Sequence, residues 1–246
     1  MLSSESLTHQ EDRMQPGQTL PDGSFTGVPF DVNERATFIT RTYTHLFGAI
    51  CGFTALEIYY FSSGLAETMA RAMLGTSWLL VLGAFMVVGW LASRAAMSAE
   101  TKPMQYAALG GFVVAKSIIF VPLLYVANSY APGTIQSAAW VTILGFMGLT
   151  AVAFITKKDF SFLKGIVTFG MIAALIGIAA SILLGFTLGT WFSVLMIGLA
   201  GAAILWETSD IMRTFPQDRY VGASLQLFAS VALMFWYVLQ LFMSRD

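Results

Sequence analysis

The 246-residue sequence is poor in charge, in cysteine and in histidine. Only 11% of its residues are charged, against about 25% in soluble globular domains, which excludes an ordinary cytosolic fold. The formal net charge of −1 offers no basic surface to nucleic acid, so we expect no nucleic-acid partner. The single cysteine, Cys51, excludes an intramolecular disulfide and a CxxC zinc site, and two histidines are too few for a histidine-rich metal centre. An integral membrane protein without a bound cofactor remains.

Long uncharged stretches dominate the rest of the chain. Two of them, 117–156 and 165–206, are long enough for two spans each and contain turn-forming residues near their middles, which is typical of helical hairpins. Backbone amides in lipid must pair within the protein, and these runs are too long and too evenly apolar for barrel strands. We therefore expect an all-α, polytopic membrane protein with seven transmembrane helices, near residues 42–62, 76–96, 106–127, 136–156, 163–184, 191–212 and 219–243.

The two ends of the chain differ in character. Residues 1–40 have no long apolar run and no signal-peptide pattern, which predicts a disordered tail ahead of a transmembrane domain at 41–246. Ten of the thirteen Lys and Arg residues fall on the side of this tail and two on the other. That bias predicts a cytoplasmic N-terminus, whereas the few residues after Leu241 leave the side of the C-terminus open.

Ionisable side chains inside the predicted spans are the candidate functional residues, because a charge in the bilayer must be paired or hydrated. Glu207 and Asp210 are three residues apart on one helix face, where they could hold a proton or a hard cation; alternatively, Asp210 only caps the helix end. Lys116 lies near mid-membrane, where it requires a carboxylate partner or a wet cavity, or else must lose its proton. We expect Glu57 to reach water, and we interpret His45 as an interfacial polar residue, with a pH switch as the alternative.

Three local patterns resemble the transmembrane Bax-inhibitor-motif family. They are a lysine-lysine-aspartate loop, an aromatic-acid helix end and a leucine-rich start of the last span: Lys157-Lys158-Asp159-Phe160-Ser161-Phe162-Leu163, Trp206-Glu207-Thr208-Ser209-Asp210-Ile211 and Leu225-Gln226-Leu227-Phe228-Ala229-Ser230. The resemblance extends from about Arg41 to Met243.

The resemblance implies a seven-helix bundle of the Bax-inhibitor type, in which the other helices wrap a hairpin-like central helix, in a bacterial inner membrane. It also implies a pH-sensitive calcium leak controlled by two facing aspartates. Glu207 stands at the first of these positions and Ser230 at the second, where it cannot ionise, and Arg94 corresponds to an arginine of the second helix.

Two functions follow as hypotheses. The first is a pH-sensitive cation leak, with Ca²⁺ as the permeant ion and Glu207 at its constriction. The alternative is a non-conducting protein that binds and modulates another membrane protein, such as a membrane-bound AAA protease. An enzyme is not expected, because the chain has no HExxH motif and no GxSxG motif to accompany His45.

Overall fold

The computed structural model describes residues 32–76, 78–98 and 101–244. Within them the predicted all-α class is confirmed, since these residues form eight α helices and one short 3-10 helix without any strand. In chain order these are α2 (Val32–Ser62), α3 (Leu65–Leu74), α4 (Trp78–Ser98), α5 (Lys102–Tyr130), α6 (Thr134–Thr156), α7 (Phe162–Leu184), α8 (Gly189–Arg213), η1 (Gln217–Arg219) and α9 (Tyr220–Met243).

The chain divides into two units, Met1–Thr37 and Phe38–Asp246. In the first, the described residues are the opening turns of α2, where the Thr37 hydroxyl donates to the backbone carbonyl of Asn33 at 2.8 Å. Residues 1–31 of the disordered tail predicted for 1–40 lie outside the described residues. The prediction is wrong for residues 32–40, because α2 begins at Val32. The second unit contains the rest of α2 from Phe38 onward, the other helices and the candidate site.

The predicted count of seven membrane spans is not confirmed. Among the described residues five helical segments are long and apolar enough to cross a membrane, namely Lys102–Tyr130, Thr134–Thr156, Phe162–Leu184, Gly189–Arg213 and Gln217–Met243. A sixth span arises only if α2 and α3 are counted together, and these two helices are bent by 94° at their junction. The remaining helix, α4, overlaps the second predicted span.

The sequence did not predict the bend that creates α3. Gly64 adopts a left-handed backbone with φ of 78°, which glycine tolerates without a steric penalty, and it lies at the junction where the chain bends by 94°. Ala66 and Ala70 then pack against Val121 of α5. The second predicted span begins at residue 76. In the structure this position lies between α3, which ends at Leu74, and α4, which begins at Trp78.

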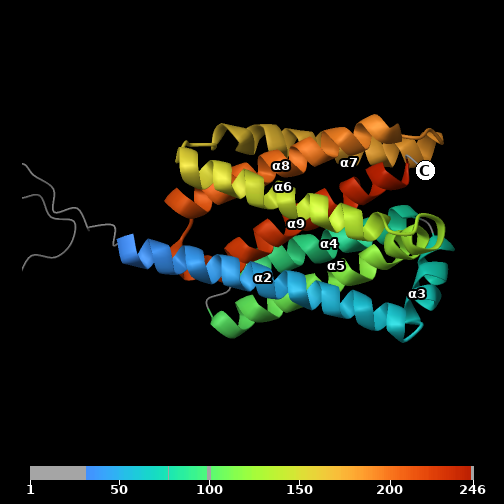
Figure 1. Cartoon of the computed structure of the whole chain (residues 1–246), viewed down its shortest axis with the longest axis horizontal. Coiled ribbons are helices and arrows are strands. Elements are labelled where there is room, and N and C mark those ends of the chain that lie inside the picture. Colours follow the sequence, from blue (N-terminus) through green and yellow to red (C-terminus); the bar gives the residue numbers. More distant parts are fainter. Residues whose placement is uncertain (1–31, 77, 99–100, 245–246) are drawn as a thin grey trace, which may run out of the picture. The chain divides into compact units, whose positions relative to one another are not determined.

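The central element of the second unit is α9, which packs against α4, α5, α6 and α8 (Figure 1). It is a single helix, so the hairpin-like central helix implied by the family resemblance is not what the structure contains. An aromatic cluster joins it to α5. Phe120 of α5 lies with its ring centroid 5.7 Å from Phe235 and 5.0 Å from Trp236, both on α9, and 5.1 Å from Phe53 on α2.

Phe120→Ala tests this cluster. Phe120 is 2% exposed, so truncation leaves a cavity among three aromatic rings and we expect a loss of roughly 3 kcal/mol in the free energy of unfolding. Phe169→Ala is the matched control, because Phe169 on α7 is 76% exposed. Thermal unfolding of the purified variants in one detergent measures both, and equal losses for the two would contradict the assignment.

Candidate functional site

The candidate site lies where α8 and α9 pack against each other. Buried residues on α8 recur at helical spacing along one stripe: Ala200, Ala203, Ile204, Glu207, Thr208 and Ile211. On α9 the corresponding stripe is Ala223, Leu227, Ser230, Met234 and Val238. Small and branched residues on both stripes let the helices approach closely. The same spacing that buries the apolar side chains therefore carries one acid and one hydroxyl into the contact.

Glu207 and Ser230 meet in this contact. The Ser230 hydroxyl donates a hydrogen bond of 2.9 Å to Oε1 of Glu207, and the two residues are 7% and 8% exposed, respectively. The second oxygen, Oε2 of Glu207, is buried without a hydrogen-bond partner. A buried carboxyl group with half of its hydrogen-bonding capacity unused is costly, so a change in its proton or in its hydration favours a change in the packing of α8 on α9.

Asp210 does not complete a carboxylate pair with Glu207. Its side chain accepts a hydrogen bond from the Thr214 hydroxyl, and its backbone carbonyl accepts from the amides of Thr214 and Phe215 at 2.8 and 2.9 Å. Asp210 thus closes the end of α8, which is the alternative that the sequence left open. No group of three or more His, Cys, Asp or Glu residues gathers within the described parts of the chain.

The lysine-lysine-aspartate loop is fastened to α8 next to Glu207. The Ser209 hydroxyl accepts from the backbone amide of Phe160 at 3.3 Å and donates to the carbonyl of Lys158 at 3.2 Å. The Arg213 guanidinium donates to the carbonyl of Lys157. Two of the sequence patterns that resemble the family are therefore in direct contact. A movement of α8 would displace this loop or break its hydrogen bonds to α8.

Asp159 shapes the same loop from outside the spans. Its Oδ1 accepts from the Ser161 amide at 2.8 Å and from the Ser161 hydroxyl at 2.5 Å. These hydrogen bonds hold the pKa of Asp159 below its usual value, and the Arg213 charge lowers it further. Asp159 therefore remains ionised at neutral pH and orders the turn that leads into α7.

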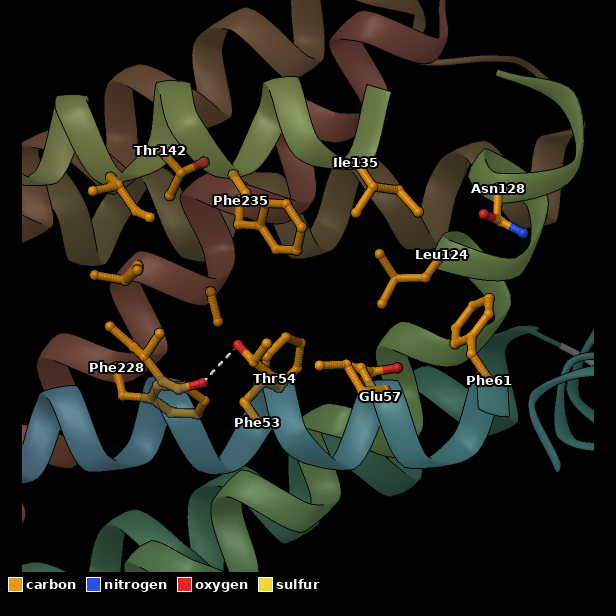
Figure 2. A pocket seen from close by; sticks show the side chains of 16 residues that line it. Phe53, Thr54, Glu57, Phe61, Leu124, Asn128, Ile135, Thr142, Phe228 and Phe235 are labelled. Atoms are coloured by element: carbon orange, nitrogen blue, oxygen red, sulfur yellow. Dashed lines mark hydrogen bonds between the residues drawn. The ribbon is translucent and has the colours of Figure 1, made fainter. Parts of the chain in front are cut away.

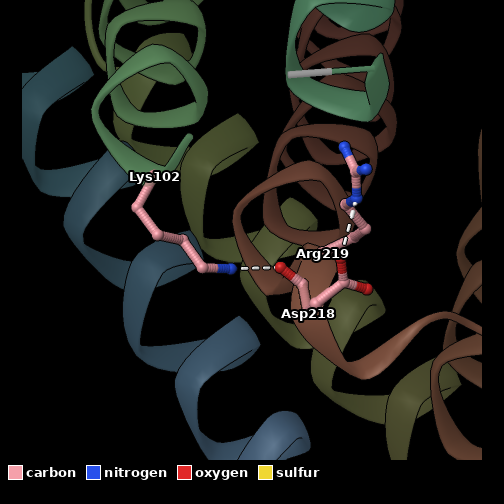
Figure 3. A network of polar contacts seen from close by, with 3 residues as sticks. All are labelled: Lys102, Asp218 and Arg219. Atoms are coloured by element: carbon pink, nitrogen blue, oxygen red, sulfur yellow. Dashed lines mark hydrogen bonds and ion pairs between the residues drawn. The ribbon is translucent and has the colours of Figure 1, made fainter. Parts of the chain in front are cut away.

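A second polar cluster ties the start of α9 to α2 and α5. The Lys102 ammonium donates to the backbone carbonyl of Asp218, whose carboxylate lies 3.1 Å from Nε of Arg219 (Figure 3). Nearby, Nε2 of His45 is 3.0 Å from the Tyr106 hydroxyl. His45 is thus held within this cluster, and its bonds are to Tyr106 and to its own helix rather than to Glu207.

Lys116 and Arg94 lie outside the Glu207 contact. The Lys116 ammonium is 5.4 Å from the Phe112 ring centroid and faces a cavity of about 430 Å³ that Tyr237 and Gln240 also line. The Arg94 guanidinium lies 5.3 Å from the ring of Trp90 on its own helix. Of the five residues singled out from the sequence as site candidates, Glu207 and Ser230 come together directly and Asp210 is one turn away.

The expectation that Glu57 reaches water is wrong. Glu57 is 7% exposed, and both of its carboxyl oxygens are buried without a hydrogen-bond partner.

Sequence reasoning also missed Tyr43, whose hydroxyl donates to Oγ1 of Thr208 at 3.3 Å and so connects α2 to the residue after Glu207. Thr208 and Ser209 belong to the pattern around Glu207, so their positions were available in the sequence, whereas nothing local marks Tyr43.

Comparisons with known proteins support this assignment of patterns. The family model described as inhibitor of apoptosis-promoting Bax1 matches residues 35–246. The chain is 34% identical over 132 residues to the modulator of FtsH protease YccA of Escherichia coli K12. This match covers 52% of the chain and 60% of YccA, so the chain spans less than two thirds of the length of that relative. It is also 25% identical over 253 residues to the Golgi anti-apoptotic protein of vaccinia virus strain Lister, covering 98% of the chain and 96% of the viral protein.

Ser230→Ala tests the contact between α8 and α9. It removes the hydroxyl that donates to Glu207, and we expect a loss of about 1–3 kcal/mol in the free energy of unfolding because a buried carboxyl oxygen is left unpaired. Ser224→Ala is the control, since the Ser224 hydroxyl is buried but donates to the carbonyl of Val221 in its own helix. Thermal unfolding is measured for Ser230→Ala, for Ser224→Ala, for Glu207→Gln and for the double variant Ser230→Ala/Glu207→Gln. The loss in the double variant should be smaller than the sum of the losses in Ser230→Ala and Glu207→Gln. Additive losses in the free energy of unfolding would contradict a coupling between Ser230 and Glu207.

Proposed function

The chain belongs to the Bax inhibitor family of membrane proteins, and from that premise we propose that it is a pH-sensitive cation leak gated where Glu207 meets Ser230. Ca²⁺ is the proposed permeant ion. We assign it no enzymatic step and no bound cofactor. The observation that carries the proposal is a buried carboxyl group shared between two helices, with one oxygen bonded across the contact and the other free of any hydrogen bond.

The chemistry of the contact suits a hard cation better than a soft one. The carboxylate of Glu207 and the hydroxyl of Ser230 are oxygen ligands, the kind that Ca²⁺ prefers. Ca²⁺ takes six to eight oxygens, so these groups would supply part of its shell and water the rest. In the arrangement described here they are packed together, which corresponds to the closed state in our proposal.

Opening requires that α8 and α9 separate at Glu207. A carboxylate repels nearby electron-rich oxygens and attracts water and cations, whereas a protonated carboxyl group can donate a hydrogen bond to a neighbour. Gain or loss of one proton therefore changes which arrangement of the two helices is preferred. The hydrogen bonds of Ser209 and Arg213 would transmit that change to the loop at Lys157 and Lys158.

The single acid distinguishes this chain from the pattern that its family resemblance implies. With Ser230 in place of a second acid, only one group titrates in the contact. We expect the pH dependence of any flux to follow one proton rather than a shared proton. We also propose that the N-terminus is cytoplasmic, on the basis of the Lys and Arg distribution.

Glu207→Gln tests the leak. In proteoliposomes loaded with a calcium dye, wild-type protein should admit Ca²⁺ at a rate that depends on pH, and Glu207→Gln should lose that dependence because the titrating group is gone. Ser230→Asp should steepen it by adding a second acid. Glu67→Gln is the control, because Glu67 is exposed on α3 and pairs with Arg71. Equal flux through wild type, Glu207→Gln and protein-free vesicles would refute a leak.

The second candidate function is a non-conducting modulator of another membrane protein. It is favoured by the 34% identity to YccA, a protein named for modulating the FtsH protease. The partner in this case is a membrane-bound AAA protease. Residues 1–31, which precede α2, are the segment that we propose contacts it.

Crosslinking in native membranes tests this alternative. We expect a stoichiometric crosslink to the protease with the full chain and at least roughly a tenfold weaker one after deletion of residues 1–31, because the deletion removes the proposed contact while keeping α2 whole. Deletion of Arg245 and Asp246 from the other end is the control. A crosslink that survives the N-terminal deletion would place the contact elsewhere, and absence of any crosslink would reject the modulator.

A further inference from the structure

A cavity of about 460 Å³ lies among α2, α5, α6 and α9, apart from the Glu207 contact. Its size falls in the range of small-molecule sites. Figure 2 shows Glu57 extending from α2 into this space, with Thr142 of α6 across it and Leu124 and Asn128 of α5 at one side. Neither Glu207 nor Ser230 lines it, so the cavity is a separate feature of the molecule.

Glu57 is the unusual group in the cavity. It is 7% exposed, and neither of its oxygens has a hydrogen-bond partner. The ion pairs in the described part of the chain join Arg71 to Glu67 and Arg219 to Asp218, so Glu57 has no cationic partner there. An unpaired buried acid is strongly unfavourable, and a cation that enters the cavity would relieve that cost.

The walls indicate which cation fits. Four phenylalanines line the cavity together with the acid, namely Phe53, Phe61, Phe228 and Phe235. Aromatic faces attract organic cations, and their apolar rings accommodate a carbon body. The Thr142 hydroxyl is also buried without a partner and offers an acceptor for an N–H group.

A bare metal ion fits these walls poorly. The polar lining consists of Glu57, Thr54, Asn128 and Thr142, and the Thr54 hydroxyl is already donated to the carbonyl of Ile50 at 2.9 Å. The other twelve lining residues are apolar, so a metal ion with its shell of water would lie mostly against carbon rather than oxygen.

Two residues that line the cavity are also exposed at the apolar surface of the bundle. Ile58, the neighbour of Glu57, lines the cavity and is 64% exposed, and Ile143 of α6 lines it and is 41% exposed. An amine that carries an apolar group partitions into a bilayer and would meet the cavity from that side.

We propose that this cavity is a binding site for organic ammonium ions with an apolar body, in which the Glu57 carboxylate pairs with the ammonium group and the phenylalanines hold the apolar part. Glu207 and Ser230 do not line the site, so its binding can be measured separately from the proposed leak.

Direct binding tests the site. Tritiated propranolol, a protonated amine with an aromatic body, is the probe, and the protein is held in nanodiscs of phosphatidylcholine, which carry no net charge. We expect saturable binding to the wild-type protein. Glu57→Gln should weaken it at least roughly tenfold, because the charge-assisted hydrogen bond is lost, and Thr142→Val should weaken it by roughly threefold. Glu67→Gln, at an exposed acid on α3, should bind as wild type.

A comparison on the wild-type protein keeps the test decisive even if Glu57→Gln fails to fold. A neutral competitor with the same aromatic body, in which a hydroxyl replaces the amine, should displace the probe at least roughly tenfold less effectively. Equal displacement by the neutral compound would identify an apolar site for lipid chains and overturn the proposal. Binding that does not saturate above that of empty nanodiscs, or equal affinity in a folded Glu57→Gln protein, would overturn it as well.

Discussion

The hydrogen bond between Ser230 and Glu207 joins α8 and α9 inside their buried contact. Glu207 carries an acid into a stripe of apolar residues, and its Oε2 stays unbonded even after Ser230 has donated to Oε1. Because α9 also packs against α4, α5 and α6, the position of α9 at this contact affects most of the second unit. In our proposal, the closeness of the two helices depends on the state of this one carboxyl group.

The neighbours of Glu207 couple that group to more distant elements. Thr208 is bonded to Tyr43 on α2, and Ser209 is bonded to the backbone of the loop between α6 and α7. Consecutive residues on one turn of α8 thus reach three different parts of the fold. A rearrangement at Glu207 would be distributed to α2, to α9 and to the loop, which suits either a gate or a surface that a partner protein reads.

The two buried acids of this chain serve different purposes in our interpretation. Glu207 is bonded across a helix contact, whereas Glu57 faces an aromatic cavity without any bonded partner. A carboxyl group in a tight contact responds to a proton, since little else can enter. A carboxyl group in a cavity of about 460 Å³ has room for a ligand, and the walls decide which one.

The sequence by itself determined the helical class, the approximate bounds of the long helices and the presence of an acid, Glu207, within one of them, because burial of the backbone in lipid and the cost of a charge there act on each segment separately. Only the tertiary structure decided that Ser230 bonds Glu207, that Asp210 closes a helix end, that Glu57 is buried and that Lys116 lies elsewhere. It also decided the bend at Gly64 that separates α3 from α2. These features depend on which faces of different helices meet, and helices that are apolar on nearly every side do not specify those faces in their sequence.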